Sequence, residues 1–207
     1  GRIGRVQVIG QGTAHVAGQS LAAALAEAAP DGQLSVEALP ATELSGFGLR
    51  DDMSDTLVIA ISQSGTTTDT NRTVDLARAR GATVVAIVNR RQSDLTDKAD
   101  GVLYTSDGRD VEMSVASTKA FYAQIAAGFL LAWAIAREVG GSVDPTLLAA
   151  LRELPTAMEE TLTRRAGIAA AAQQLAPAKR YWAIVGNGPN RVAAEELRIK
   201  LSELCYR

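Results

Sequence analysis

Apolar residues along this chain fall into short runs that alternate with segments of helical periodicity. The runs that predict strands cover residues 6–9, 35–39, 57–61, 83–88 and 102–104. They are rich in β-branched residues and show little polar alternation, as is typical of parallel strands that are covered on both faces. The segments between them predict helices, among them one over about 14–29. We therefore expect an α/β fold: a doubly wound parallel sheet with helices on both faces, in three αβα layers.

The pattern changes after residue 116. Residues 117–139 predict one long helix that is apolar on more than one face and therefore needs burial on several sides. Residues 144–175 carry leucines at helical spacing with charges between them, and Pro155 predicts a break or kink in this helical connector. These long helices either pack on a partner subunit or cover only their own sheet, and the pattern favours neither alternative.

Residues 181–188 repeat the plan of residues 6–12: an apolar run, a glycine, a polar residue, a glycine and then a helix. This repeat predicts a strand near 181–185 that opens a second α/β unit. No later strand in the chain closes the crossover, so we expect the natural polypeptide to continue. The predicted organisation is a first domain at 1–142, a helical connector at 143–178 and the start of an incomplete second domain at 179–207.

Composition narrows the classes of function. The chain has 21 basic and 23 acidic residues, 4% aromatic residues and no basic run, which argues against a nucleic-acid partner. A single cysteine, Cys205, excludes an internal disulfide and fits a reducing compartment, and a single histidine excludes a histidine-rich metal site. The N-terminus lacks the apolar core of a signal peptide, and we expect that no apolar run approaches the length needed to span a membrane. We expect a cytoplasmic protein that does not contact a membrane.

The strand predicted at 57–61 leads directly into a segment rich in hydroxyl side chains, Ser-Gln-Ser-Gly-Thr-Thr at 62–67. At a strand-to-helix turn, free backbone N–H groups and the positive end of the helix dipole favour an anion. Gly65 would let the backbone approach a ligand closely. Ordinary helix capping is the alternative, but a cap needs only one such residue. The segment therefore favours a phosphate site.

Two further polar segments are expected at the same edge of the sheet, because strand-end turns of a doubly wound sheet meet there. They are the turn at 10–13 and the segment 112–119, in which Ser117 is a natural helix N-cap. Lys119 is either a cation for the ligand or a solvated side chain. Three hydroxyl-bearing turns suit a phosphorylated, polyhydroxylated ligand. A dinucleotide fingerprint is disfavoured because His15 and Arg191 stand where each Gly-x-Gly turn would need a third glycine.

The segments 61–67 and 115–121, in this order, resemble the sugar isomerase (SIS) domains of the glutamine:fructose-6-phosphate aminotransferase family, also called glucosamine-6-phosphate synthases. The likeness covers nearly the whole chain: one SIS domain, the connector and the start of a second. It implies an SIS-type three-layer sandwich, in agreement with the strand pattern.

The resemblance also implies which residues bind the sugar phosphate. Ser62, Gln63, Ser64 and Thr67 would hold the phosphate, Gly12 and Thr13 would form the first turn, and Val115 and Ser117 would contact the sugar. Ala14 stands where the family usually has serine, so one ligand hydroxyl is missing. Thr66 replaces a residue that is often glutamate, and we expect this change to matter little.

The family's second SIS domain carries a lysine and, three residues later, the glutamate that moves a proton between sugar carbons 1 and 2. Lys200 and Glu203 match this spacing. Residues three apart share one helix face, where an ammonium group favours a charged carboxylate. The residues alone leave open that Glu196, Lys200 and Glu203 form only a solvated row of helix pairs.

The activity that the resemblance implies is the conversion of fructose 6-phosphate and ammonia to glucosamine 6-phosphate, without a metal or organic cofactor. The ammonia would come from glutamine in a glutaminase domain elsewhere in the polypeptide. The family's ring-opening histidine and Schiff-base lysine would lie beyond Arg207, so the chain alone should be inactive. A homodimer is expected. The alternatives are a sugar-phosphate-sensing SIS module without catalysis and an SIS-type amino sugar phosphate deaminase or deglycase.

Overall fold

The fold is built on a parallel sheet of five strands in the order β2-β1-β3-β4-β5. The computed structural model describes residues 3–107, 112, 114 and 116–205, so Val115 lies outside the described residues. The strands are β1 (Arg5–Gly10), β2 (Ser35–Pro40), β3 (Thr56–Ser62), β4 (Thr83–Val88) and β5 (Gly101–Tyr104). The chain moves from β1 outward to β2 and then returns to β3 on the other side of β1. The switch in strand order therefore lies between β1 and β3, where ligands of doubly wound sheets bind.

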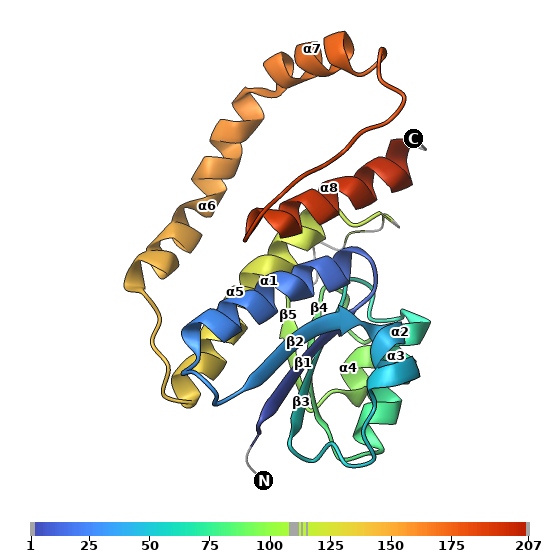
Figure 1. The fold of residues 1–207 in the computed structure, drawn as a ribbon, viewed down its shortest axis with the longest axis vertical. Coiled ribbons are helices and arrows are strands. Elements are labelled where there is room, and N and C mark those ends of the chain that lie inside the picture. The colour runs from blue at the N-terminus through green and yellow to red at the C-terminus, as the bar shows by residue number, and fades with distance from the viewer. Residues whose placement is uncertain (1–2, 108–111, 113, 115, 206–207) are drawn as a thin grey trace.

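Helices cover both faces of this sheet (Figure 1). One face is covered by α1 (Thr13–Ala28) and α5 (Lys119–Glu138), and the other by α2 (Ala41–Glu43), a π-helical turn at Leu44–Gly48, α3 (Thr68–Arg78) and α4 (Asp94–Lys98). Alternate residues of β3 enter different cores: Ile59 and Ile61 pack with Leu21 of α1, whereas Val58 packs with Val74 of α3. The predicted doubly wound α/β sandwich is confirmed.

Helix α5 is long and apolar enough to cross a membrane by length and composition, so the expectation that no run approaches that length is wrong. In this fold the helix packs along α1, where Gly128 admits Leu21 so closely that an added Cβ would lie 3.3 Å from the Cβ of Leu21. Ala132 and Ala136 of α5 are fully buried in the core with β1 and β3. The helix therefore covers its own sheet, while Tyr122 and Leu130 remain about half exposed on its outer side.

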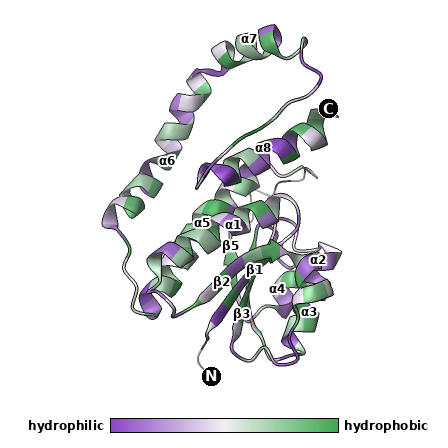
Figure 2. Cartoon of the chain, viewed as in Figure 1, coloured by the Kyte–Doolittle hydropathy of each residue, from purple (hydrophilic) through white to green (hydrophobic). Residues whose placement is uncertain are grey.

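Two helices lead away from the sandwich as an arm (Figure 1), composed of α6 (Pro145–Thr163) and α7 (Arg165–Leu175). Neither helix contains a buried residue. Apolar and polar side chains alternate along both of them (Figure 2). Helix α6 continues through Pro155, so the helix does not break there, and it ends instead at Thr163.

The last helix, α8 (Asn190–Cys205), returns to the sandwich beside α1 (Figure 1). Val192 and Ile199 of α8 pack against Val16 of α1 and Phe121 of α5. The strand predicted at 181–185 is not formed. Tyr181 and Val185 are each 82% exposed, and a strand without a neighbouring strand cannot satisfy its backbone groups.

Candidate functional site

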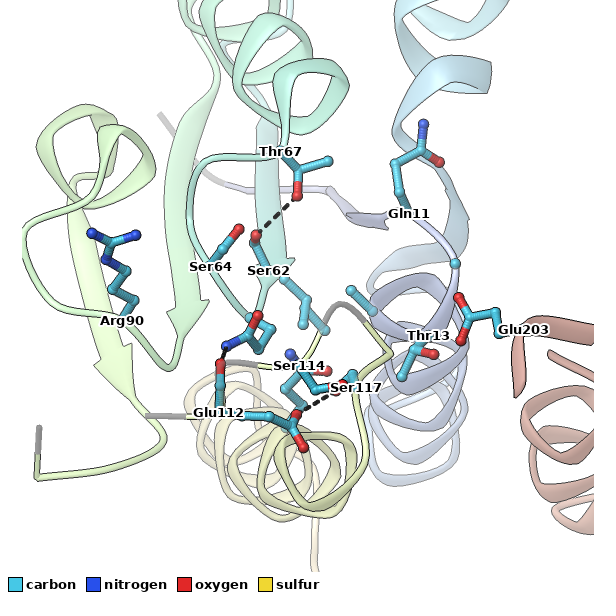
Figure 3. Close-up of a pocket in the computed structure, with 15 residues that line it drawn as sticks. Gln11, Thr13, Ser62, Ser64, Thr67, Arg90, Glu112, Ser114, Ser117 and Glu203 are labelled. Carbon is cyan, nitrogen blue, oxygen red and sulfur yellow. Dashed lines mark hydrogen bonds between the residues drawn. The ribbon is translucent and has the colours of Figure 1, made fainter. Parts of the chain in front are cut away.

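A cavity of about 530 Å³ lies where the strand order switches between β1 and β3 (Figure 3). The structure brings together at this cavity most of the predicted site residues: Gly12, Thr13, Ser62, Gln63, Ser64, Thr67, Ser117 and Glu203. Lys200 does not line the cavity but contacts Thr13, which does. The three polar turns thus converge as the strand topology predicts, and α8 joins them through Glu203 and Lys200.

The turn after β3 is shaped by hydrogen bonds within itself. Ser62, which is 2% exposed, accepts a hydrogen bond from the backbone N–H of Gly65 over 3.0 Å. The Ser64 hydroxyl accepts from the backbone N–H and from the hydroxyl of Thr66, over 3.2 and 3.0 Å. These contacts curl the chain around its own hydroxyls. The resulting turn precedes α3, whose N-terminus carries a partial positive charge.

Gly65 is held in this turn from behind. Its φ of +68° lies in the left-handed region, and an added Cβ would lie 1.9 Å from the Ser93 hydroxyl oxygen. The amide of Asn71 donates to the carbonyls of Gly65 and Thr67, over 3.0 and 3.1 Å. Only glycine fits this backbone and this space, and the Asn71 hydrogen bonds hold two carbonyl groups of the turn in place.

Thr67 is the N-cap residue of α3, but its side chain makes no capping hydrogen bond. Its hydroxyl lies 3.4 Å from the Ser62 hydroxyl (Figure 3). A residue that served only as a helix cap would place its oxygen on the backbone N–H groups of the first turn. The Thr67 side chain is instead at the cavity wall, which favours the ligand-binding interpretation of this segment.

Glu112 stabilises the polar segment 112–119 and connects it to the turn after β3. Its buried carboxylate accepts from the backbone N–H of Thr118 over 2.9 and 3.1 Å, from the Thr118 hydroxyl, and from the Ser117 hydroxyl over 3.2 Å. The Gln63 amide donates to the Glu112 carbonyl. Ser117 is therefore not the N-cap residue of α5, which is Thr118. The Ser117 hydroxyl donates to Glu112 instead.

The pKa of Glu112 reflects this arrangement. Burial raises the pKa, but the hydrogen bonds from Thr118 and Ser117 together outweigh burial, and the pKa of Glu112 lies below its ordinary value of 4.5. The carboxylate is thus charged at neutral pH. It acts as a fixed acceptor that holds the segment, rather than as an acid with a proton to give.

Helix α8 reaches the cavity through a chain of polar contacts. The Thr13 hydroxyl donates to Glu196 over 3.1 Å and accepts from the Lys200 ammonium over 3.0 Å. Lys200 also lies 3.3 Å from Glu196 and 3.0 Å from Glu203. Glu196 is 7% exposed, so the row of helix pairs is not simply solvated. Gln19 of α1 adds a second link to α8 by donating to Glu195 over 2.8 Å.

Charge is distributed unevenly around the cavity. Arg90 is the one cation among the described residues that line it, and in Figure 3 it lies on the same side of the cavity as Ser64. Glu203 lies at the opposite side, near Thr13 (Figure 3). The hydroxyl-rich turn and Arg90 suit the anionic part of a ligand, and the carboxylate of Glu203 faces the other part.

Sequence reasoning missed the roles of three residues that line the cavity: Arg90, Glu112 and Gln124. Gln124 had a visible signal, because it is the one amide in the apolar stretch 120–136. Glu112 was visible as a carboxylate just before a helix start. Arg90 had no signal, because an arginine after a strand is most often solvated.

Comparisons with known proteins agree with this architecture. The SIS domain family model matches residues 2–134. A glutamine–fructose-6-phosphate aminotransferase (isomerizing) from Mycolicibacterium smegmatis is 40% identical over 167 residues, which cover 78% of this chain and 26% of the relative. The enzyme of the same name from Halobacterium salinarum is 33% identical over 207 residues, 99% of this chain and 33% of the relative. The chain therefore spans about a quarter to a third of the length of these relatives.

A solved structure shares the fold over almost the whole chain. It is the C-terminal domain of glucosamine-fructose-6-phosphate aminotransferase from Francisella tularensis, with a TM-score of 0.85, 24% identity, and coverage of 99% of this chain and 57% of that one. The fold includes the arm and α8, which lie outside the part matched by the family model. Because the family model covers most of the sandwich and a relative aligns over nearly the full length, this chain belongs to the SIS domain family.

Proposed function

We propose that the cavity binds a hexose phosphate, and that the chain is the sugar-phosphate-binding isomerase part of a glucosamine-6-phosphate synthase-like enzyme. The reaction is the conversion of fructose 6-phosphate and ammonia to glucosamine 6-phosphate. One observation carries the proposal: the hydroxyl-rich turn after β3 and the carboxylate of Glu203 line the same cavity from opposite sides. A phosphate and a proton-transfer site are both needed, and they must be separated by the length of a sugar.

The proposed binding roles follow the family resemblance and, for every residue except Val115, which lies outside the described residues, the lining of the cavity. Ser62, Gln63, Ser64 and Thr67 hold the phosphate, while Gly12, Thr13, Val115 and Ser117 surround the sugar. Hydroxyl groups and backbone N–H groups offer neutral donors to phosphate oxygens, and the N-terminus of α3 adds its dipole. The internal hydrogen bonds of the turn support this role, because a preformed site loses little conformational entropy on binding.

In the proposed chemistry, ammonia adds to the ketone at carbon 2 of the sugar and water leaves to form an imine. Glu203 takes a proton from carbon 1 and returns one to carbon 2, while the proton of the carbon 1 hydroxyl passes to the imine nitrogen, which converts the imine to the 2-amino aldose. Lys200 holds Glu203 through its ion pair and fixes the position of α8 through Thr13. Both residues are on α8, so the docking of α8 on α1 sets the position of the base.

The rest of the enzyme is also a proposal. We infer that residues 1–142 form a first SIS domain, that 143–178 connect it to a second, and that 179–207 begin the second. The glutaminase domain that would release ammonia from glutamine, and a partner subunit in a homodimer, belong to the full-length protein. The chain's span of a quarter to a third of its relatives supports this assignment.

Binding is tested by titrating the chain with fructose 6-phosphate, glucosamine 6-phosphate and inorganic phosphate in a calorimeter. We expect both sugar phosphates to bind more tightly than inorganic phosphate. Equal affinity for all three would end the sugar-phosphate proposal. Because titration needs no turnover, the result does not depend on residues that act only in catalysis.

Catalysis is tested with Glu203→Gln in the full-length protein. The variant should lose isomerisation and keep sugar phosphate binding, because the amide preserves shape but cannot accept a proton. Glu159→Gln, on the exposed face of the arm, is the matched control and should leave both unchanged. Binding in the wild-type protein without any turnover would instead favour a sugar-phosphate-sensing module.

A further inference from the structure

Gln124 is a buried amide at the cavity that has no hydrogen-bond partner among the residues the structure describes. It lies on α5 among otherwise apolar residues, is 1% exposed, and lines the cavity. Neither its Nε2 nor its Oε1 makes a hydrogen bond with the described residues. A buried polar group without a hydrogen-bond partner destabilises the fold, and most buried polar groups in proteins are hydrogen-bonded. An amide with both ends unpaired beside a cavity therefore calls for a partner in the cavity.

The chemistry of an amide restricts that partner. Gln124 offers two N–H donors and a carbonyl acceptor on one planar group. A phosphate dianion has acceptors only, so it can use one end of this group. A sugar hydroxyl donates and accepts, so hydroxyls on adjacent carbons can satisfy both ends together. The rest of the described cavity wall already supplies hydroxyl donors at the turn after β3.

We propose that Gln124 binds the hydroxyl groups of the sugar and selects a polyhydroxylated ligand over a simple phosphate. The inference rests on the proposed hexose phosphate site and adds a residue to it. A ligand that lacks these hydroxyl groups leaves the buried amide unpaired. Enzymes that hydrogen-bond a substrate hydroxyl reject analogues without it for this reason.

The inference makes a paired prediction about stability and binding. Replacing an unpaired buried amide by an apolar side chain of similar size removes a desolvation penalty, so unliganded Gln124→Leu should melt at the same temperature as the wild type or higher. The same change should weaken the binding of fructose 6-phosphate about tenfold. Affinity for inorganic phosphate should not change. The ratio of the two affinities is therefore the main readout.

Gln124→Met is a second variant, because its unbranched side chain adapts to the space with the least strain. Thr70→Val is the matched control. Thr70 on α3 is 1% exposed and its hydroxyl is also unpartnered, but it does not line the cavity. It should gain stability as Gln124→Leu does, while both affinities stay at wild-type values.

The outcomes are separable. If Gln124→Leu and Gln124→Met bind fructose 6-phosphate as tightly as the wild type, the inference is overturned and the hexose phosphate site stands. If both variants melt lower and lose fructose 6-phosphate and inorganic phosphate alike, Gln124 is structural and the inference is also overturned. If the wild type binds fructose 6-phosphate no better than inorganic phosphate, the proposed function itself fails.

Discussion

The Thr13 hydroxyl donates to Glu196 over 3.1 Å, although 183 residues separate the two in the chain. Thr13 begins α1 directly after the first turn of the cavity, and Glu196 lies in the middle of α8. The same hydroxyl accepts from Lys200. One small side chain thus joins the turn that is proposed to bind the sugar to the helix that is proposed to supply the base.

Thr13→Val should release α8 from α1 without unfolding the sheet. Valine has the same shape but removes the hydroxyl donor to Glu196, which keeps only its ion pair with Lys200, and the other oxygen of Glu196 has no partner among the described residues. We expect the change to destabilise docking by about 1–3 kcal/mol. Hydrogen exchange should become roughly ten- to a hundredfold faster across α8, with β1 and β3 unaffected.

Thr163→Val is the control for this prediction. Thr163 bonds only within the exposed arm, to the carbonyl of Glu160. Its variant should leave exchange in α8 unchanged. Wild-type protection of α8 in Thr13→Val would show that apolar packing and the hydrogen bond from Gln19 to Glu195 hold the helix without Thr13.

Gly65→Ala should damage the turn after β3 for two reasons that can be separated. The alanine must adopt a left-handed backbone conformation, which costs about 1–2 kcal/mol, and its Cβ collides with Ser93. Gly140→Ala shares the first cost, with φ +84° and open space around the new Cβ. Thermal unfolding should therefore show a larger loss for Gly65→Ala than for Gly140→Ala. Adding Ser93→Gly should recover part of the difference.

Arg90 and Arg91 form a natural pair of test and control. Arg90 lines the cavity, whereas the Arg91 guanidinium lies 4.3 Å over the ring centre of Tyr104. Arg90→Ala should weaken the binding of fructose 6-phosphate about threefold to tenfold. The effect should be smaller at high salt, because salt screens an exposed charge. Arg91→Ala should bind as the wild type does. Calorimetric titrations at low and high salt measure both effects, and equal behaviour of the two variants would remove Arg90 from the site.

Glu112 should contribute to acid lability. Its pKa in the folded protein lies below the ordinary value of 4.5, so the unfolded chain binds more protons as the pH falls through this range. Its contribution to stability is present above pH 4.5 and is lost as the pH falls toward the folded pKa. Glu112→Gln should melt lower than the wild type at pH 7, and the gap should narrow in acid. Melting temperatures across this pH range test the prediction, and a constant gap would contradict it.

The sheet was predictable because each strand carries its own signal. Residues 57–61 form a continuous apolar run rich in β-branched side chains. The observed strand extends beyond this run by only one residue at each end. The convergence of the turns at 10–13 and 62–67 followed from topology alone, because β1 and β3 are neighbours on either side of the switch in strand order.

Features that depend on distant partners were not predictable from local pattern. The segment 181–185 has a strand's composition but no neighbour to pair with. The hydroxyl of Ser117 bonds Glu112 rather than capping α5, because a carboxylate was in reach. The link between Thr13 and Glu196 requires the path of the whole arm, which no window of sequence reveals.

The arm has a consequence for how the site is assembled. Its helices bury no residue, so the chain leaves the sandwich after α5 and returns with α8 as the only docked part. The contacts between α8 and α1 therefore place Glu203 at the cavity, because the arm contributes no buried side chain that could hold the helix there.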